Sequence, residues 1–147
     1  MAKLSAPLTC LTAGGLGIVY VALQARVGLH RLSTGIMFGN ASAEGKAEDK
    51  ALTAKMRAGG NMQEYVPLGL VIMLLLETAT PVPQKAVAAY GAALALSRLI
   101  AAYGIANNFT PGSNARLLRK YGFLGTFGTI FAAGAYLTFH AVKTLHK

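Results

Sequence analysis

The sequence has few cysteines and few charged residues, and each scarcity excludes a class of protein. Cys10 is the only cysteine, so an internal disulfide is excluded and a cysteine-based metal site is not expected. Charged residues make up 13% of the chain, whereas an ordinary soluble domain carries about 25%. Hydrophobic residues make up 54%, and the mean hydropathy is +0.47. The composition of these 147 residues therefore predicts a single integral membrane domain covering 1–147.

The net charge of +9 raises the question of a nucleic-acid partner. The chain contains no run of basic residues and no RNA- or DNA-binding motif, so we expect no nucleic acid. The cations instead stand at the ends of apolar stretches, as they do in membrane proteins. No spacing of histidines or acids resembles a metal site, so no metal is expected either.

Four apolar stretches predict four transmembrane helices, at about 5–30, 57–80, 85–107 and 116–141. The first contains 22 uncharged residues, 4–25, and crossing a hydrocarbon core takes about 20. A signal peptide is the competing interpretation, but the apolar region is long and no cleavage site precedes a soluble domain. Pro67 falls inside the second helix and should kink it or end a first short piece. The predicted fold class is all-α, an integral membrane four-helix bundle.

The polar loop at about 32–56 separates the first two helices. Residues 43–56 are rich in Ala, Glu and Lys and are predicted to be helical. Their charged side chains, including Glu48, Asp49 and Lys55, are interpreted as a solvated face without chemistry. His30, between two arginines, is interpreted as a surface residue. Two groups of glycines predict close helix contacts: Gly14, Gly15 and Gly17, and Gly122, Gly125 and Gly128.

The distribution of cations predicts the orientation of the chain in the membrane. Nine cations flank the two polar loops and four lie on the opposite side, so the positive-inside rule places the loops in the cytoplasm and both termini on the other side. The nine are Arg26, Arg31, Lys46, Lys50, Lys55, Arg57, Arg116, Arg119 and Lys120, and the four are Lys3, Lys85, Lys143 and Lys147.

A polar cluster stands where the second apolar run begins. Arg57, Asn61, Glu64 and Tyr65 are spaced i, i+4, i+7 and i+8, which places all four on one face of a helix. Such groups at membrane depth must pair with one another or bind something. One interpretation is a clamp between helices. The other is a site for a small zwitterion, whose carboxylate would meet the cation and whose ammonium would meet the acid.

Arg98 lies well inside the third predicted helix. The second and third helices form an antiparallel hairpin about residue 82, so residues 98 and 64 lie 16 and 18 positions from its turn. Because a helix rises about 1.5 Å per residue, the two lie at similar membrane depth. We therefore expect Arg98 to face Glu64 or the same ligand, and Tyr103 to lie toward the same opening.

Together these residues resemble a known family. The pattern Arg57-Ala58-x-x-Asn61-x-x-Glu64-Tyr65-x-Pro67, with four spans, is similar to the MAPEG family, the membrane-associated proteins in eicosanoid and glutathione metabolism. Three further stretches are similar to other motifs of that family, and the first of them matches its bacterial, microsomal glutathione transferase-like members. They are Arg26-Val27 with Gly35 and Gly39, Arg98-Leu99-Ile100-Ala101-Ala102-Tyr103-Gly104, and Arg119-x-x-Gly122-x-x-x-Thr126.

The resemblance implies a homotrimer that binds glutathione between neighbouring subunits near the cytoplasmic face. It implies that glutathione is bound by Arg57, Asn61, Glu64 and Tyr65, with Arg98 supporting Glu64, Tyr103 lining the pocket, and Arg31 or Arg26 coming from the adjacent subunit. It also implies that Arg119, or else Arg116, activates the thiol. A free thiol has a pKa near 8.5, and a guanidinium at a helix N-terminus favours the thiolate. The expected reaction is attack on a hydrophobic electrophile dissolved in the bilayer, as in a transferase or peroxidase.

Two other functions stay open at this point. Bacterial members commonly have His where this chain has Ala101, and the eicosanoid enzymes have Tyr where it has Ile105. These departures favour a non-catalytic lipid- or glutathione-binding scaffold of the same fold. A proton-driven four-span exporter would need an acid deep in a helix, and Glu77 near the end of the second helix is a poor substitute because the first helix has none.

Overall fold

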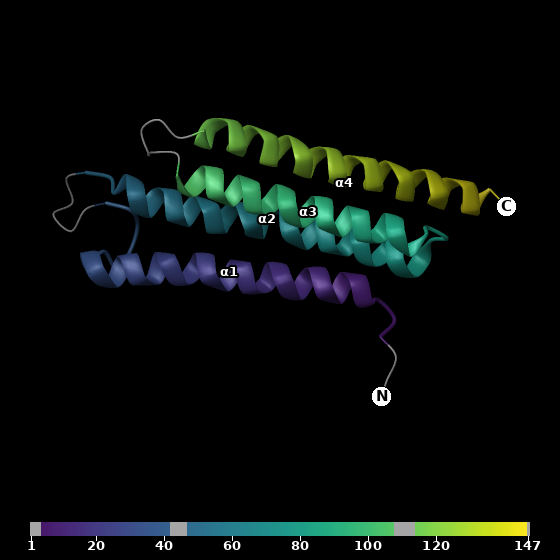
Figure 1. The fold of residues 1–147 in the computed structure, drawn as a ribbon, viewed down its shortest axis with the longest axis horizontal. Helices are drawn as coiled ribbons and strands as arrows, with labels where there is room; N and C mark the ends of the chain where they lie inside the picture. The colour runs from purple at the N-terminus through teal and green to yellow at the C-terminus, as the bar shows by residue number, and fades with distance from the viewer. Residues whose placement is uncertain (1–3, 42–46, 108–113, 147) are drawn as a thin grey trace.

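The computed structural model describes residues 4–41, 47–107 and 114–146. These residues form four α-helices (Figure 1): α1 Pro7–Thr34, α2 Lys50–Ala79, α3 Gln84–Ala106 and α4 Ala115–Leu145. All four are long and apolar enough to cross a membrane. The predicted all-α fold with four membrane-spanning helices is confirmed, and the chain is an integral, multi-pass membrane protein.

The helices extend further at the loop end than the sequence predicted. α1 continues to Thr34 and ends where Gly35, with φ +72°, donates its N–H to the Arg31 carbonyl oxygen at 2.9 Å. α2 begins at Lys50 rather than near 57, because the Asp49 carboxylate accepts the Leu52 N–H at 2.8 Å and caps the helix.

One expectation about this region was wrong, and one of the two alternatives for Pro67 is excluded. Glu48 pairs with Ala41 in an isolated antiparallel bridge and Asp49 is a helix cap, so the predicted helix over 43–56 does not include them. Residues 43–46 of that prediction lie outside the described part of the chain. Pro67 does not end a first short piece, because α2 runs through it without interruption from Lys50 to Ala79.

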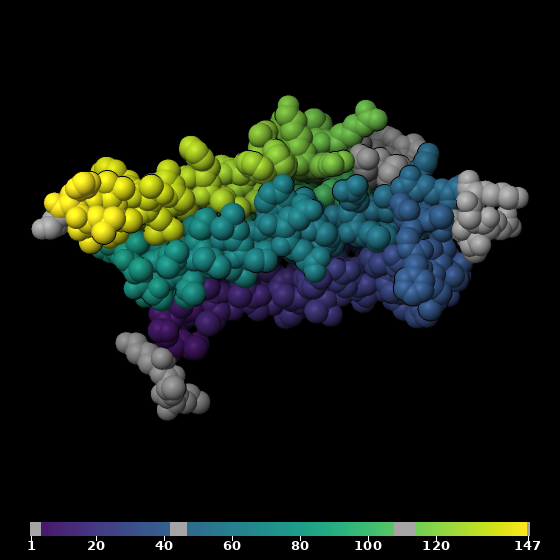
Figure 2. All heavy atoms as spheres, turned by 180° about the vertical axis from the view of Figure 1, so that it is seen from behind, coloured from purple at the N-terminus to yellow at the C-terminus, as the bar shows by residue number. Residues whose placement is uncertain are grey.

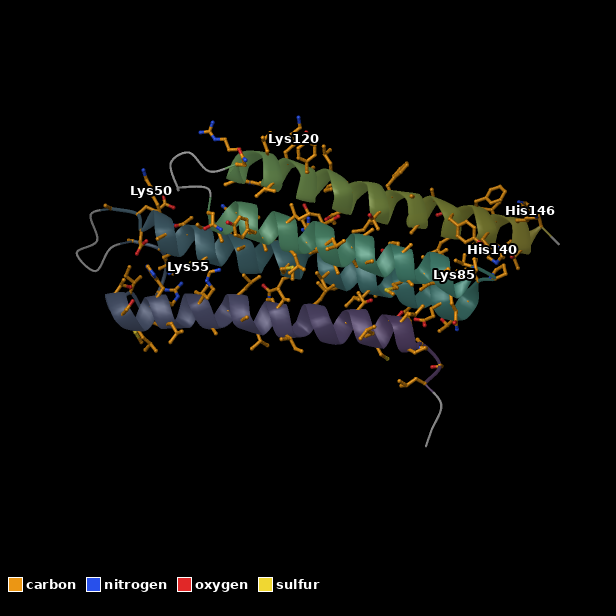
Figure 3. The ribbon with its side chains drawn as sticks, in the orientation of Figure 1. Lys50, Lys55, Lys85, Lys120, His140 and His146 are labelled. Atoms are coloured by element: carbon orange, nitrogen blue, oxygen red, sulfur yellow. The ribbon has the colours of Figure 1, made fainter. Side chains whose placement is uncertain are left out.

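The helices are arranged with α2 and α3 in the middle, α1 on one side and α4 on the other (Figures 1 and 2). Within the described residues α1 contacts α2 and α3, α4 contacts α3 and α2, and α1 does not contact α4. The two polar loops lie at one end of the bundle and the α2–α3 turn lies at the other (Figure 1). Figure 3 shows Lys50 and Lys55 at the loop end, and Lys85, His140 and His146 at the opposite end.

Glu77 joins the N-terminus of α1 to the end of α2. Its Oε1 accepts the Leu8 N–H at 2.9 Å, and its Oε2 accepts the Thr9 N–H at 2.8 Å and the Thr9 hydroxyl at 2.7 Å. The first N–H groups of a helix have no partner within it and carry partial positive charge, so a carboxylate is well suited to this place. Glu77 is therefore a structural cap for α1.

A chain of hydrogen bonds closes the other end of the α1–α2 pair. His30 Nε2 lies 2.7 Å from Asp49 Oδ2, and Lys55 Nζ lies 2.6 Å from His30 Nδ1. An ammonium can only donate, so Nδ1 accepts from Lys55 and Nε2–H donates to Asp49. His30, Asp49 and Lys55, which were expected to be solvated surface groups, are therefore partly buried and bonded to one another. The bond from His30, followed by that from the Leu52 N–H, lowers the pKa of Asp49 below its ordinary 3.8.

Close packing of α3 on α4 requires glycine at Gly122 and brings Gly125 next to a side chain of α3. A Cβ added to Gly122 would lie 2.5 Å from the Ala101 backbone nitrogen, and one added to Gly125 would lie 2.5 Å from the Ser97 hydroxyl oxygen. Gly128 has nothing within 4 Å of that position. The predicted close packing is therefore confirmed within this chain at Gly122 and Gly125, and for Gly128 packing against another subunit stays a prediction.

We predict that Gly122→Ala destabilises the protein and that Gly128→Ala does not. The new methyl group at 122 meets backbone atoms that cannot rotate away, and overpacking of this kind costs about 1–3 kcal/mol. At 128 the methyl group enters open space and alanine is the better helix former. Thermal unfolding of both variants in the same detergent checks this, and equal melting temperatures would contradict the packing described for Gly122.

We also predict that Asp49→Ala lowers the melting temperature at neutral pH, because it removes a helix cap worth about 1 kcal/mol and the bond to His30. The lowered pKa means that Asp49 stabilises the fold fully above pH 3.8, and that this contribution is lost as the pH falls from 3.8 through the folded-state value. The difference between wild type and Asp49→Ala should therefore shrink at the most acidic pH. Lys50→Ala, at the neighbouring exposed position, is the control and should change little at either pH.

Candidate functional site

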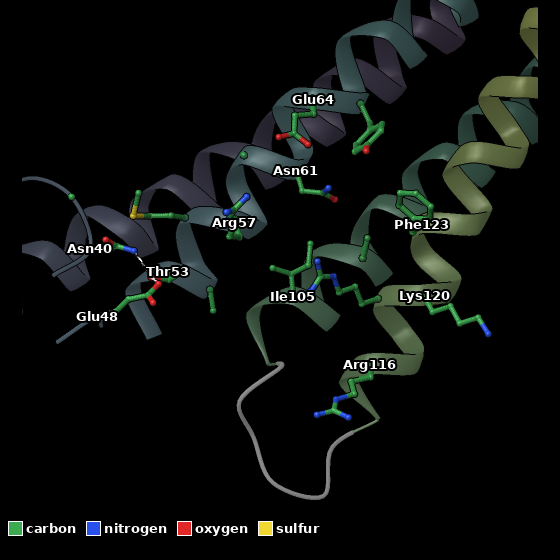
Figure 4. A pocket seen from close by; sticks show the side chains of 17 residues that line it. Asn40, Glu48, Thr53, Arg57, Asn61, Glu64, Ile105, Arg116, Lys120 and Phe123 are labelled. Atoms are coloured by element: carbon green, nitrogen blue, oxygen red, sulfur yellow. Dashed lines mark hydrogen bonds between the residues drawn. The ribbon is translucent and has the colours of Figure 1, made fainter. Parts of the chain in front are cut away.

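A cavity of about 1170 Å³ opens at the loop end of the bundle, between α2, α3, the start of α4 and the first loop (Figure 4). Its walls combine charged, amide, hydroxyl and apolar side chains. The lining residues are Gly39, Asn40, Glu48, Thr53, Ala54, Met56, Arg57, Gly60, Asn61, Glu64, Tyr65, Ala101, Ile105, Arg116, Arg119, Lys120 and Phe123.

The polar face of α2 forms one wall of the cavity. Arg57, Asn61, Glu64 and Tyr65 all line it, as their helical spacing predicts. The side chains of Arg57 and Glu64 are exposed, and neither makes a hydrogen bond or an ion pair with any part of the chain that the structure describes. This arrangement argues against a clamp in which the two charges satisfy each other.

Arg98 lies beneath this wall with only 1% of its surface exposed. Its Nε donates to the Thr126 hydroxyl oxygen at 2.7 Å and its Nη2 to the Gly122 carbonyl oxygen at 3.2 Å, both on α4. Its Nη1 donates to Asn61 Oδ1 on α2 at 2.8 Å. The guanidinium carbon also lies 4.9 Å from the centre of the Tyr65 ring, within range of a cation–π interaction.

Arg98 was expected to face Glu64 or the same ligand, and it forms no ion pair with Glu64, whose charge acts on it only at longer range. Among the described residues no carboxylate lies within 4.0 Å of Arg98, and its partners are neutral oxygens and an aromatic ring. Because Asn61 Oδ1 is turned toward Arg98, the amide NH₂ of Asn61 is left to donate into the cavity. Arg98 thus orients one lining residue without lining the cavity itself.

The first turns of α4 supply the cationic wall. Arg116, Arg119 and Lys120 line the cavity, and Figure 4 shows Arg116 and Lys120 on the α4 segment that faces α3. The start of α4 lies close to α3 because Gly104 has no side chain: a Cβ there would lie 2.5 Å from the Arg119 backbone nitrogen. With Arg57, the described residues of the lining carry four cations against two carboxylates, those of Glu48 and Glu64.

Three of the predicted site residues lie elsewhere in this chain. Tyr103 is 62% exposed and is not among the lining residues. The lining positions Ala101 and Ile105 each stand two residues from it, which is more than half a turn around the helix. Arg26 is exposed, and Arg31 is bonded to the carbonyl oxygens of its own loop. Whether Arg26 or Arg31 reaches a neighbouring subunit stays a prediction.

Sequence reasoning missed the wall that the first loop contributes. Asn40 Nδ2 donates to Glu48 Oε1 at 3.0 Å and to Thr53 Oγ1 at 3.1 Å, and the Thr53 hydroxyl donates to Glu48 Oε1 at 2.8 Å. The Asp49 N–H donates to the Asn40 carbonyl oxygen at 2.7 Å. These hydrogen bonds join a loop to the start of a helix, so the helical periodicity of the sequence does not predict them.

A group of three aromatic side chains extends from the opposite rim of the cavity. Phe123 lines the cavity and its ring lies 4.2 Å from that of Phe127, which in turn lies 5.8 Å from the ring of Tyr65. Among the described residues no three His, Cys, Asp or Glu side chains are placed to hold a metal ion. The cavity thus offers charges, hydrogen-bond donors and an apolar edge.

Comparison with protein-family models gives a match to the MAPEG family over residues 9–139. The chain belongs to the MAPEG family. Members of this family are glutathione transferases, glutathione peroxidases or related enzymes. No curated protein and no solved structure gives a significant match.

In this MAPEG protein, each residue of the Arg119-x-x-Gly122-x-x-x-Thr126 motif has a structural role that the contacts explain. Gly122 admits α3 at close range and offers its carbonyl oxygen to Arg98, while the Thr126 hydroxyl accepts from Arg98 and donates to the Gly122 carbonyl oxygen at 2.9 Å. Two of the three motif positions therefore hold the buried guanidinium in place, and the third, Arg119, lines the cavity.

We predict that Arg98→Met destabilises the protein by about 2–4 kcal/mol, because buried polar groups of Thr126 and Asn61 lose their partner. Arg98→Lys should recover only part of this loss, since an ammonium on a shorter side chain cannot reach all three oxygens. Arg26→Met, at an exposed position, is the control and should stay within about 0.5 kcal/mol of wild type. Unfolding in detergent measures all three, and a stable Arg98→Met would show that the guanidinium does not hold the helices together.

Proposed function

We propose that this protein binds glutathione in the cavity and activates its thiol for attack on hydrophobic electrophiles, as a membrane-bound transferase or peroxidase. The observation that carries the proposal is the pair Arg57 and Glu64. Both line the cavity, and neither makes a hydrogen bond or an ion pair with the described residues, while each guanidinium nitrogen of the buried Arg98 beside them is hydrogen-bonded. Charges left free in a cavity at membrane depth fit a charged ligand.

The lining matches the groups that glutathione carries, namely two carboxylates, an ammonium and two peptide groups. Arg57 would bind one carboxylate in a bidentate pair and Glu64 would take the ammonium. The Asn61 NH₂, oriented by Arg98, would donate to a peptide carbonyl oxygen. Tyr65 would contact the peptide backbone, and the excess of cations at the rim suits a ligand with net negative charge.

The start of α4 would provide the activation step. Arg119, with Arg116 as the second candidate, stands in the first turns of α4, where guanidinium charge and helix dipole both favour an anion. The thiol proton would pass to solvent at the cavity mouth. The thiolate would then form a carbon–sulfur bond with the electrophile, whose leaving group departs with the electron pair. Phe123 and Phe127 would guide an apolar electrophile from the bilayer.

A homotrimer is part of this proposal, with the polar loops in the cytoplasm. α1 and α4 do not contact one another within the described residues, so each presents a broad exposed face. The α1 glycines Gly14, Gly15 and Gly17 have nothing within 4 Å of an added Cβ in this chain, which suits close packing on another subunit. Of the two arginines, Arg26 is the better candidate for reaching the site of a neighbouring subunit, because the guanidinium of Arg31 is already hydrogen-bonded to its own loop.

One observation favours the alternative, a non-catalytic binding scaffold. Ala101 and Ile105 make the α3 wall of the cavity apolar, so α3 itself presents no proton donor or acceptor side chain there. Such a scaffold would bind glutathione without turning over a chloronitrobenzene substrate, whereas the transferase would conjugate it. The exporter hypothesis loses its acid, because both oxygens of Glu77 are bonded to the start of α1.

We predict that glutathione titrated calorimetrically into the detergent-purified protein binds, and that Arg57→Ala and Glu64→Ala each weaken binding by about tenfold or more, since each removes a charge-assisted pair worth about 1.5–3 kcal/mol. Lys85→Ala, an exposed cation at the opposite end of the bundle, should bind like wild type (Figure 3).

Absence of binding to the folded wild type would overturn the proposal and leave the cluster a structural feature. Binding that is retained by both cavity variants would place glutathione elsewhere. Conjugation of chloronitrobenzene, measured on the same wild-type preparation, then separates the transferase from the scaffold.

A further inference from the structure

The first loop begins with a tightly held turn over residues 35–39. Gly35 and Gly39 both have positive φ, +72° and +66°, which other residues adopt only with strain. The Arg31 guanidinium spans the turn, with Nη1 donating to the Ile36 carbonyl oxygen at 3.1 Å and Nη2 to the Gly39 carbonyl oxygen at 3.0 Å. The turn is therefore fixed at both ends by one side chain.

This turn hides one apolar side chain and displays two. Ile36 is 6% exposed and packs with Val27 and Leu52, whereas Met37 is 69% exposed and Phe38 is 90% exposed. Moving a side chain of this size from water into an apolar environment is favourable by about 1.5–3 kcal/mol. Because the turn is held rigidly and exposes Phe38, transfer of this side chain from water into an apolar phase would be favourable.

The apolar phase nearest to this turn is the lipid bilayer, because the turn follows directly on a membrane-spanning helix. α1 presents an exposed apolar stripe from Leu11 to Leu32, whose other members are Ile18, Val21 and Leu29. The span expected at 5–30 is long enough to cross a hydrocarbon core of about 30 Å, and its last turns carry Arg26 and His30, so its end lies at the headgroups. The polar Glu77–Thr9 contact lies just before one end of the stripe, and residues 35–39 follow just after the other.

We propose that Met37 and Phe38 insert into the membrane interface and anchor the first loop there. Part of the loop expected at 32–56 in the cytoplasm would then lie among the lipid headgroups. The same turn ends in Gly39 and Asn40, which line the cavity, so the anchor sets the position of the cavity wall against the membrane. The tip would act in this way whether or not the cavity binds glutathione.

The chain contains no tryptophan, so Phe38→Trp introduces a single fluorescent reporter. The full-length variant is reconstituted into vesicles of phosphatidylcholine and phosphatidylglycerol, with and without lipids brominated near the top of the acyl chains. Phe38→Trp should emit at shorter wavelength and lose most of its intensity to brominated lipid. The matched control, Ala51→Trp at an exposed position in the first turn of α2, should be quenched by aqueous acrylamide and little by bromine.

Two results would overturn the proposal. Equal quenching of both variants by acrylamide, without quenching by bromine, would place the tip in water. Protection of Phe38→Trp from both quenchers would place it against another copy of the chain instead. Met37→Trp provides a second reporter at an exposed position. Adding Arg31→Ala to Phe38→Trp should increase quenching by acrylamide, because the turn loses the two hydrogen bonds that Arg31 donates to it.

Discussion

The guanidinium of Arg98 is the interaction on which the geometry of the site depends. A buried cation in a membrane-spanning bundle is costly, and here it is stabilised by three oxygens and an aromatic ring from α2 and α4 rather than by a carboxylate. The contact with Gly122 is possible because that residue lets α4 lie directly against α3. Arg98 therefore fixes the spacing of three helices and turns the amide of Asn61 toward the cavity.

Some charged groups of this chain hold a segment of backbone in place, and others form no hydrogen bond with the described residues. Glu77, Asp49 and Arg31 each form hydrogen bonds that end, cap or fold a segment of backbone. Arg57 and Glu64, which line the cavity, form none with the described residues. Two opposite charges that share one wall of a cavity and form no hydrogen bond there are available to a polar ligand.

Periodicity and hydropathy predicted the parts of the fold that repeat along one helix. They gave four spans and the common face of Arg57, Asn61, Glu64 and Tyr65. Counting residues from the α2–α3 turn placed Arg98 at the right depth, but depth carries no information on rotation about the helix axis. Arg98 accordingly hydrogen-bonds to Asn61 and forms no ion pair with Glu64, and Tyr103 is exposed and does not line the cavity. The part of the cavity wall formed by the first loop was not predicted, because its hydrogen bonds depend on one local turn and not on a repeating pattern.

The early start of α2 explains how a membrane helix can also build the side of a cavity. The Asp49 cap adds nearly two helical turns before Arg57, and these turns carry Thr53 and Met56 into the lining. His30 and Lys55 hold that extension against α1, and Arg31 reaches Met56 Sδ at 3.3 Å from the same side. A helix beginning at 57 would leave Arg57 at a frayed terminus. The extension instead places Arg57 inside a regular helix, where its direction relative to Asn61 and Glu64 is set by the backbone.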